Sequence, residues 1–281
     1  MAKVKIVTDS LADIPLALMK GLEITVVPCT LHFGNKTYRD KMDLTTADFY
    51  RLLATHPTLP TTSHPSVGIF EEVYTQLARE TSQIFSIHIA SVLSGTWNAA
   101  NIAAKSVSNG HLTVEVFDSQ QLSMAQGWLV VLAARAAMEG RTLAAIKAMV
   151  SEAQARARII AMLDTLEYAQ RSGRLGKAAG MVGSLLNIKP LLSLSHGEVV
   201  PLGGARTQNS ALERLVEIAL DLGLTQELAI VHCYAEVLAR RLKGLLMAHV
   251  PEDQITIAET GPVSGAHVGP GAVCITGLVK K

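Results

Sequence analysis

The sequence predicts an α/β protein with two domains. The N-terminal domain is expected to be a three-layer α/β/α domain with a mostly parallel sheet, because short β-branched runs alternate with helical patterns through the first half of the chain. The C-terminal domain is expected to be a two-layer α/β domain with a mixed sheet, because the second half also carries two strand-like runs on either side of a turn at His196 and Gly197. We place the domains at residues 1–155 and 156–281.

Each element of the first half follows from apolar spacing and from start signals such as Pro15, Thr45 and Ser66. The turn at Gly34 and Asn35 predicts a hairpin. In order, we expect a strand over 4–7, a helix over 14–20, a strand over 24–27, the hairpin over 30–38, helices over 45–54 and from Ser66, a strand over 84–89, a helix over 96–107, a strand over 113–117, and helices over 120–138 and 142–155.

The second half is predicted by the same reasoning, with β-branched runs for strands and apolar periodicity for helices. In order, we expect strands over 159–163, 191–194 and 199–202, a helix over 211–222, strands over 228–231 and 255–258 on either side of an Arg-containing helix, and a final strand over 272–278. The most apolar stretch, 128–134, is bounded by Gly127 and Arg135 and suits a buried helix.

Composition excludes several classes of protein. The 281 residues are 49% hydrophobic with a formal net charge of +1, yet no run of 18 apolar residues predicts an integral membrane segment. Balanced charge argues against nucleic-acid binding. The three cysteines form no CxxC pair, so neither disulfides nor a cysteine zinc site is expected. The N-terminus shows no signal-peptide pattern, and we expect a cytoplasmic protein.

Four loops at predicted strand-to-helix junctions concentrate hydroxyl residues. Helix N-termini offer unpaired N–H groups, so loops that meet at one edge of a sheet are expected to form an anion cradle. Only one Lys or Arg, Arg79, lies between Thr62 and Ala104, which suits one carboxylate better than a polyphosphate. The alternative is that these residues only cap helices. The loops are Thr8-Asp9-Ser10, Thr61 to Ser66, Ser94-Gly95-Thr96, and Asp118-Ser119 with Ser123.

Common catalytic signatures are absent. The segment from Gly173 to Lys177 lacks the spacing of a P-loop, no GxGxxG follows the first strand, and no HExxH or HxxxH predicts a metal site. A GxSxG nucleophile elbow is also missing, although residue types alone permit a serine esterase using Ser94, His267 and Asp118. A protein without any ligand stays a third alternative.

The start of the second half is its most cationic part. We expect the segment from Arg171 to Gly176 to be a flexible turn, and the glycine-rich segment from His267 to Gly271 to lead into the last strand. The cations either dock an acidic partner or phosphate, or they lie on a solvated loop. They are Arg171, Arg174, Lys177, Lys189 and Arg206.

A set of short motifs spans nearly the whole chain in a specific order. With these motifs the chain resembles the DegV family, fatty-acid-binding proteins that serve as lipid-carrying subunits of bacterial fatty acid kinase. His64 departs from the pattern, since the family usually has Gln there. The motifs are Thr8 to Asp13, Thr62 to Ser66, Leu93 to Thr96, Asp118-Ser119 with Ser123-Met124, Gly173 to Gly176, Ile188 to Pro190 followed by Gly197, and Gly265 to Gly271.

The resemblance implies that Thr62, Ser94 and His267 bind the carboxylate of a long-chain fatty acid, with backbone N–H groups at Ser63 and Gly95 as neighbours. It implies a Rossmann-like N-terminal domain that carries these loops and a second domain that covers the acyl chain. A partner kinase would phosphorylate the carboxylate, so the chain itself would not be an enzyme and would need no cofactor or metal. The residues that dock the kinase would be Arg174 and Arg206.

Overall fold

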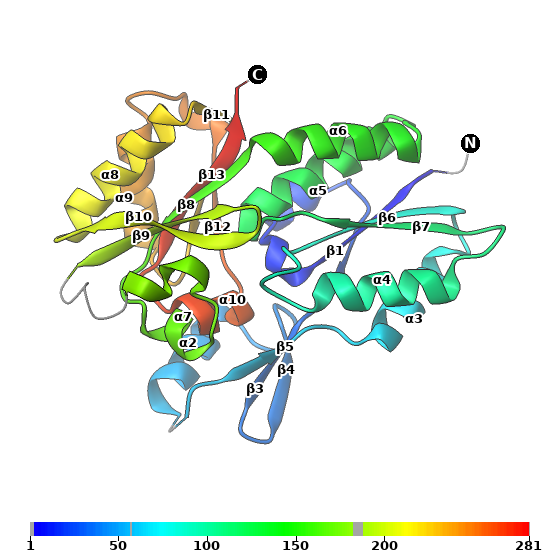
Figure 1. Cartoon of the computed structure of the whole chain (residues 1–281), viewed down its shortest axis with the longest axis horizontal. Coiled ribbons are helices and arrows are strands. Elements are labelled where there is room, and N and C mark those ends of the chain that lie inside the picture. The colour runs from blue at the N-terminus through cyan, green and yellow to red at the C-terminus, as the bar shows by residue number, and fades with distance from the viewer. Residues whose placement is uncertain (1–2, 57, 182–187, 281) are drawn as a thin grey trace.

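A computed structural model describes residues 3–56, 58–181 and 188–280, and the strands in these ranges form three sheets (Figure 1). The strands are β1 (Lys5–Asp9), β2 (Ile24–Val27), β3 (Thr30–Phe33), β4 (Lys36–Arg39), β5 (Thr61–Ser63), β6 (Gln83–His88), β7 (Thr113–Asp118), β8 (Ala157–Met162), β9 (Lys189–Ser195), β10 (Glu198–Ala205), β11 (Leu224–His232), β12 (Ile255–Glu259) and β13 (Val273–Val279).

The helices follow the predicted apolar periodicity. The expected caps Thr45 and Ser66 each accept a backbone N–H of the first turn, and so does Thr142. The helices are α1 (Leu16–Met19), α2 (Thr46–Thr55), α3 (Val67–Leu77), α4 (Thr96–Val107), α5 (Ser123–Met138), α6 (Leu143–Arg156), α7 (Glu167–Arg171), α8 (Gln208–Asp221), α9 (Glu236–Leu246) and α10 (Pro262–Val268).

The first domain is built on a four-stranded parallel sheet with the order β2-β1-β6-β7. Phe70 and Tyr74 of α3 pack with α4 and with Val7 on one face. Leu129 of α5 packs with α6 and with Phe85 on the other. Helices therefore cover both faces (Figure 1), and the predicted α/β/α layering is confirmed.

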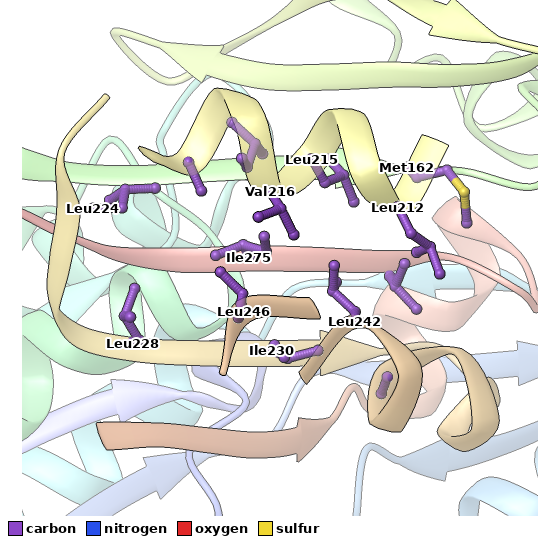
Figure 2. Close-up of a cluster of buried hydrophobic side chains, with 14 of the residues drawn as sticks. Met162, Leu212, Leu215, Val216, Leu224, Leu228, Ile230, Leu242, Leu246 and Ile275 are labelled. Atoms are coloured by element: carbon purple, nitrogen blue, oxygen red, sulfur yellow. The ribbon is translucent and has the colours of Figure 1, made fainter. Parts of the chain in front are cut away.

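The second domain is built on a six-stranded mixed sheet with the order β10-β9-β8-β13-β11-β12. β11 and β12 are parallel, while the other neighbours are antiparallel. Helices α8 and α9 pack on one face of this sheet, where Leu212, Leu215 and Leu242 meet Ile230 and Ile275 in a buried core (Figure 2). The predicted mixed sheet with helices is confirmed.

Helix α5 joins the two domains because it lies between their sheets. Its Leu129 belongs to the core of the first sheet, whereas Trp128 and Val131 pack with Val231 and Cys274 of the second. Nearly every residue of α5 is therefore buried. This double contact is the reason that its sequence is apolar on all sides rather than along one stripe.

A three-stranded antiparallel sheet with the order β4-β3-β5 lies apart from both larger sheets. Gly34 and Asn35 form the turn between β3 and β4, as predicted, and Gly34 has the positive φ of 56° that such a turn needs. The Thr61 to Ser66 loop lies between a strand and a helix, as predicted, but its first three residues themselves form that strand, β5, which pairs with β3 through Leu31 and Thr62 and not with the parallel sheet. The strand therefore belongs to the small sheet, whereas the loop itself ends at Ser66, the N-cap residue of α3.

One further expectation was wrong for a local reason, and another needs a helix added to it. Arg171 is the last residue of α7 rather than part of a flexible turn, and its side chain pairs with Glu167 one helical turn earlier at 2.7 Å. The segment from His267 to Gly271 leads into β13 as expected, but its first two residues still belong to α10, a helix whose first turn holds Pro262, where proline is favoured.

Candidate functional site

Thr62 and His267 meet at the junction of the two domains. The Oγ1 atom of Thr62 lies 2.9 Å from Nε2 of His267, although the residues are 205 positions apart in sequence. Thr62 is held in β5 by its pairing with Leu31, and His267 is carried by α10, which contacts both β3 and β5. The structure thus brings together two of the three residues to which the resemblance gave a carboxylate-binding role.

His267 is a neutral imidazole in this structure at neutral pH. Burial and, to a smaller extent, the nearby positive charge of Arg174 together lower its pKa to about 4. One ring nitrogen, Nε2, bonds Thr62, whereas Nδ1 is buried and has no hydrogen-bond partner among the described residues. A buried polar atom without a partner costs about 1–3 kcal/mol, so an acceptor or donor supplied by a ligand would be favourable there.

Ser94 and Gly95 lie between β6 and the start of α4. The Oγ atom of Ser94 accepts the backbone N–H of Thr96 at 3.3 Å and lies 2.8 Å from the Thr96 hydroxyl. Gly95 is the N-cap residue of α4 and supplies no side-chain cap. Of the four loops expected to form an anion cradle, this one most clearly presents a helix N-terminus.

His64 connects the Thr62 loop with the Ser94 loop. A Cβ atom on Gly95 would lie only 2.6 Å from Nε2 of His64, so the imidazole packs directly on the glycine. The ring is fixed by its Nδ1 atom, which lies 2.9 Å from the carbonyl oxygen of Pro65. His64, which departs from the family pattern, therefore does not simply point into solvent.

Ser63 points to the other side of β5 from Thr62, since neighbouring residues of a strand alternate between faces. Its Oγ atom lies 2.9 Å from Nε2 of His32, whose Nδ1 lies 2.9 Å from the hydroxyl of Thr37. The structure therefore brings the side chain of Ser63 to His32 and not to His267. Sequence reasoning missed His32, which carries no motif.

The two arginines predicted to dock a partner are both exposed. Arg174 lies close enough to His267 to affect its pKa and lines a crevice of about 280 Å³ together with Leu93 and Val199. Arg206 lies between β10 and α8 and forms no ion pair with any described residue. Of the other cations in this region, Lys177 pairs with Glu198 and Lys189 with Asp164.

A cluster of buried apolar residues, here called the junction cluster, lies beside these polar groups and draws on both domains. Leu31 is the strand partner of Thr62, Leu93 precedes Ser94, and Ala266 and Val268 flank His267. Its buried members are Leu11, Cys29, Leu31, Phe33, Phe49, Tyr50, Ile89, Leu163, Ala169, Leu175, Ala178, Leu192, Cys233, Val263, Ala266 and Ala272. Neutral polar groups thus border a large apolar region.

The loop after β1 is not an anion cradle, and that prediction was wrong. Asp9 is fully buried, and its carboxylate accepts from His88 Nδ1 at 2.9 Å, from the backbone N–H of Ile89 and from Gln126. Its other oxygen accepts the N–H of Leu11. A buried carboxylate at the end of β1 repels an anion, and the residues serve to join β1, β6 and α5.

The geometry gives no support to a serine hydrolase. Ser94 bonds Thr96, His267 bonds Thr62, and the carboxylate of Asp118 accepts the backbone N–H groups of Ser91 and Gln120. These residues therefore do not form a nucleophile, base and acid chain. In the described ranges, no group of three His, Cys, Asp or Glu side chains is placed to hold a metal ion, and no helix has the length and apolarity to span a membrane.

The fold and the site define a two-domain α/β protein with a neutral polar cluster beside an apolar region at the domain junction. The sequence profile of the DegV family of uncharacterised proteins matches residues 3–280. A DegV domain-containing protein from Caldanaerobacter subterraneus subsp. tengcongensis is 33% identical over 275 residues, which are 97% of each chain. This chain belongs to the DegV family.

Solved structures are similar over the same length. A DegV family protein from Thermus thermophilus, described by its fatty-acid binding, superposes with a TM-score of 0.91 and 29% identity and covers 99% of this chain and 100% of its own. DegV from Bacillus subtilis, described as a fatty acid binding protein, has a TM-score of 0.89 and 32% identity with full coverage of both chains.

Proposed function

We propose that this protein binds a long-chain fatty acid at the junction of its two domains. Thr62, Ser94 and His267 bind the carboxylate with the help of backbone N–H groups at Ser63 and Gly95, and the alkyl tail enters the junction cluster. Residues 1–155 form the Rossmann-like domain that carries the loops with Thr62 and Ser94. His267 comes from α10 of the other domain. Residues 156–281 form the domain that covers the acyl chain of the fatty acid. Fatty-acid binding by the Thermus and Bacillus relatives supports the proposal.

One observation carries this proposal: the bonded pair of Thr62 and His267, with its unpartnered Nδ1 atom, borders the junction cluster. Burial of alkyl chain contributes about 0.8 kcal/mol per CH₂, so a long tail supplies on the order of 10 kcal/mol before the entropic cost of binding. Affinity thus comes from the tail, and a few neutral groups suffice to orient the head.

The neutral character of the site fits a carboxylate that must react after it binds. A close arginine salt bridge would stabilise the carboxylate in its ground state, whereas hydroxyl and imidazole groups leave its oxygen nucleophilic. We therefore propose that a partner kinase in the cytoplasm phosphorylates the bound fatty acid with ATP, yielding an acyl-phosphate for phospholipid synthesis. This chain acts as the non-catalytic subunit and docks the kinase through Arg174 and Arg206.

Mass spectrometry of the bound lipid tests fatty-acid binding. Protein purified from bacteria and extracted under denaturing conditions should release fatty acid in a roughly equal molar amount. Thr62→Ala combined with Ser94→Ala should lower that amount, because two carboxylate donors are lost. Thr142→Ala removes a hydroxyl that caps the remote helix α6 and should retain the wild-type amount.

Two results would contradict the proposal. Folded wild-type protein that yields no lipid would exclude a tightly bound fatty acid. Covalent labelling of Ser94 by a fluorophosphonate probe would instead indicate a serine nucleophile. For the kinase step, a fatty acid kinase catalytic subunit with labelled ATP should form acyl-phosphate on the wild-type carrier, and Arg174→Ala with Arg206→Ala should slow it without lipid loss.

A further inference from the structure

Helix α10 follows β12 in the second half of the chain, yet its N-terminus lies on residues of the first half. The helix contacts α2, β3 and β5 as well as α7, which Figure 1 shows together near the small antiparallel sheet. It has only seven residues, and its N-cap residue, Gly261, provides no side-chain cap. So short a helix is unstable alone, and its placement depends on tertiary contacts.

Asp13 supplies several of these contacts. Its side chain is completely buried. One carboxylate oxygen accepts from Lys41 Nζ at 2.6 Å and from the backbone N–H of Gly261 at 3.2 Å. The other oxygen accepts from the hydroxyl groups of Ser123 at 2.7 Å and Thr260 at 2.8 Å. Asp13 thus joins the segment that enters α10 to two parts of the first domain.

Asp40 provides a second anchor for the same helix end. Its Oδ1 atom accepts the backbone N–H of Val263 at 3.1 Å, which is one of the first-turn donors that the helix itself leaves without a partner. A negative charge at this end is also favourable for the helix dipole. We call Asp13, Asp40 and Lys41 the α10 clasp.

The clasp leaves no room for a side chain at Gly261. A Cβ atom there would lie 2.5 Å from Cε of Lys41 and 2.8 Å from Oδ1 of Asp40. Four residues further along, a Cβ atom on Gly265 would lie 2.6 Å from the hydroxyl of Tyr50. The helix is therefore fixed at its N-terminus and on the face that approaches α2, and His267 follows two residues after Gly265.

We infer that Asp13 and Asp40 are positioning residues for ligand binding: from the first domain they hold the N-terminus of α10, so that His267 reaches Thr62 and the ligand carboxylate. The inference rests on the proposed function. It also assigns a role to the end of the Thr8 to Asp13 motif, which the carboxylate site leaves unexplained. Both oxygens of Asp13 and Oδ1 of Asp40 accept hydrogen bonds from donors of their own.

The test weakens the hydrogen bonds of Asp13 with two variants of different severity. Thr260→Val keeps the side-chain shape but loses the donor to Asp13, and Asp13→Asn removes the charge. The readouts are the dissociation rate of cis-parinaric acid, a fluorescent C18 fatty acid, and the imidazole NMR signals of His267, assigned with His267→Gln. We expect dissociation about five-fold faster in Thr260→Val, which corresponds to one lost hydrogen bond, at least as large an effect in Asp13→Asn, and shifted His267 signals in both variants.

Two controls separate positioning from general stability. Thr142→Ala loses the cap of α6, remote from α10, and should leave dissociation and His267 unchanged. Thr260→Ser restores the hydroxyl and should restore the wild-type rate. If Asp13→Asn fails to fold, Thr260→Val decides the question.

Wild-type dissociation and unshifted His267 signals in Thr260→Val would overturn the inference. A wild-type protein that binds no cis-parinaric acid would contradict the proposed function instead. In that case the His267 signals of the free protein still test the clasp: unshifted signals in Thr260→Val overturn it, and shifted signals support it.

Discussion

Replacement of His267 by glutamine should remove a specific pH dependence of stability. Burial lowers the pKa of His267 from 6.5 to about 4 in the folded protein. Between these values the unfolded chain binds a proton that the folded protein does not, so acid favours unfolding and stability falls as the pH falls. This difference in proton binding lowers the free energy of unfolding by about 2 kcal/mol between pH 7 and pH 5.

The assay is urea unfolding of delipidated wild type and His267→Gln at pH 7 and pH 5. Between pH 7 and pH 5 the free energy of unfolding of the variant should fall by about 2 kcal/mol less than that of wild type, because glutamine does not titrate. The contributions of the other titratable groups are the same in both proteins and cancel in the comparison. A bound fatty acid should reduce the difference, since its carboxylate raises the pKa of the imidazole. Equal losses in the two delipidated proteins would refute a buried, neutral His267.

Three other changes have outcomes that follow from single contacts. Burial raises the pKa of Asp40 to about 6, so this group stabilises the protein by about 1 kcal/mol as the pH falls from 7 to 5, and Asp40→Asn should abolish that gain in urea unfolding. Gly95→Ala should displace His64 and weaken cis-parinaric acid binding, and His64→Ala in the same chain should restore it; unchanged binding in Gly95→Ala would contradict this contact. Leu215→Ala should destabilise the core of the second domain by about 2–5 kcal/mol in denaturant and leave the acyl-chain length of the bound lipid unchanged.

The order and type of most elements follow from local sequence. Pro15 and Ser66 mark helix starts, and the His196-Gly197 turn joins β9 to β10 with both residues at positive φ. The apolar run around Trp128 correctly indicated a buried helix, because a helix between two sheets must be apolar on every side. Helix starts, turns and apolar runs depend on residues close together in sequence, so periodicity and caps suffice to predict them.

The site was less accessible to such reasoning. In the sequence, Asp9 looks like a residue of a polar ligand-binding loop. In the structure its carboxylate is hydrogen-bonded to His88 and Gln126, which are 79 and 117 residues away in sequence. Thr61 and Ser63 belong to an edge strand only because β3 is available to pair with them. The Gly261-Pro262 pair was a local signal for α10 that the glycines after His267 obscured.

The sequence by itself determined the two α/β domains, the family and the residue types of a neutral site, since periodicity, caps and ordered motifs are local properties of the chain. Only the tertiary structure decided that His267 meets Thr62, that His64 packs on Gly95 and that Asp13 and Asp40 hold α10. The physical reason is that each of these contacts joins distant segments. Their geometry depends on how two domains pack around α5 and the junction cluster, and no local pattern encodes it.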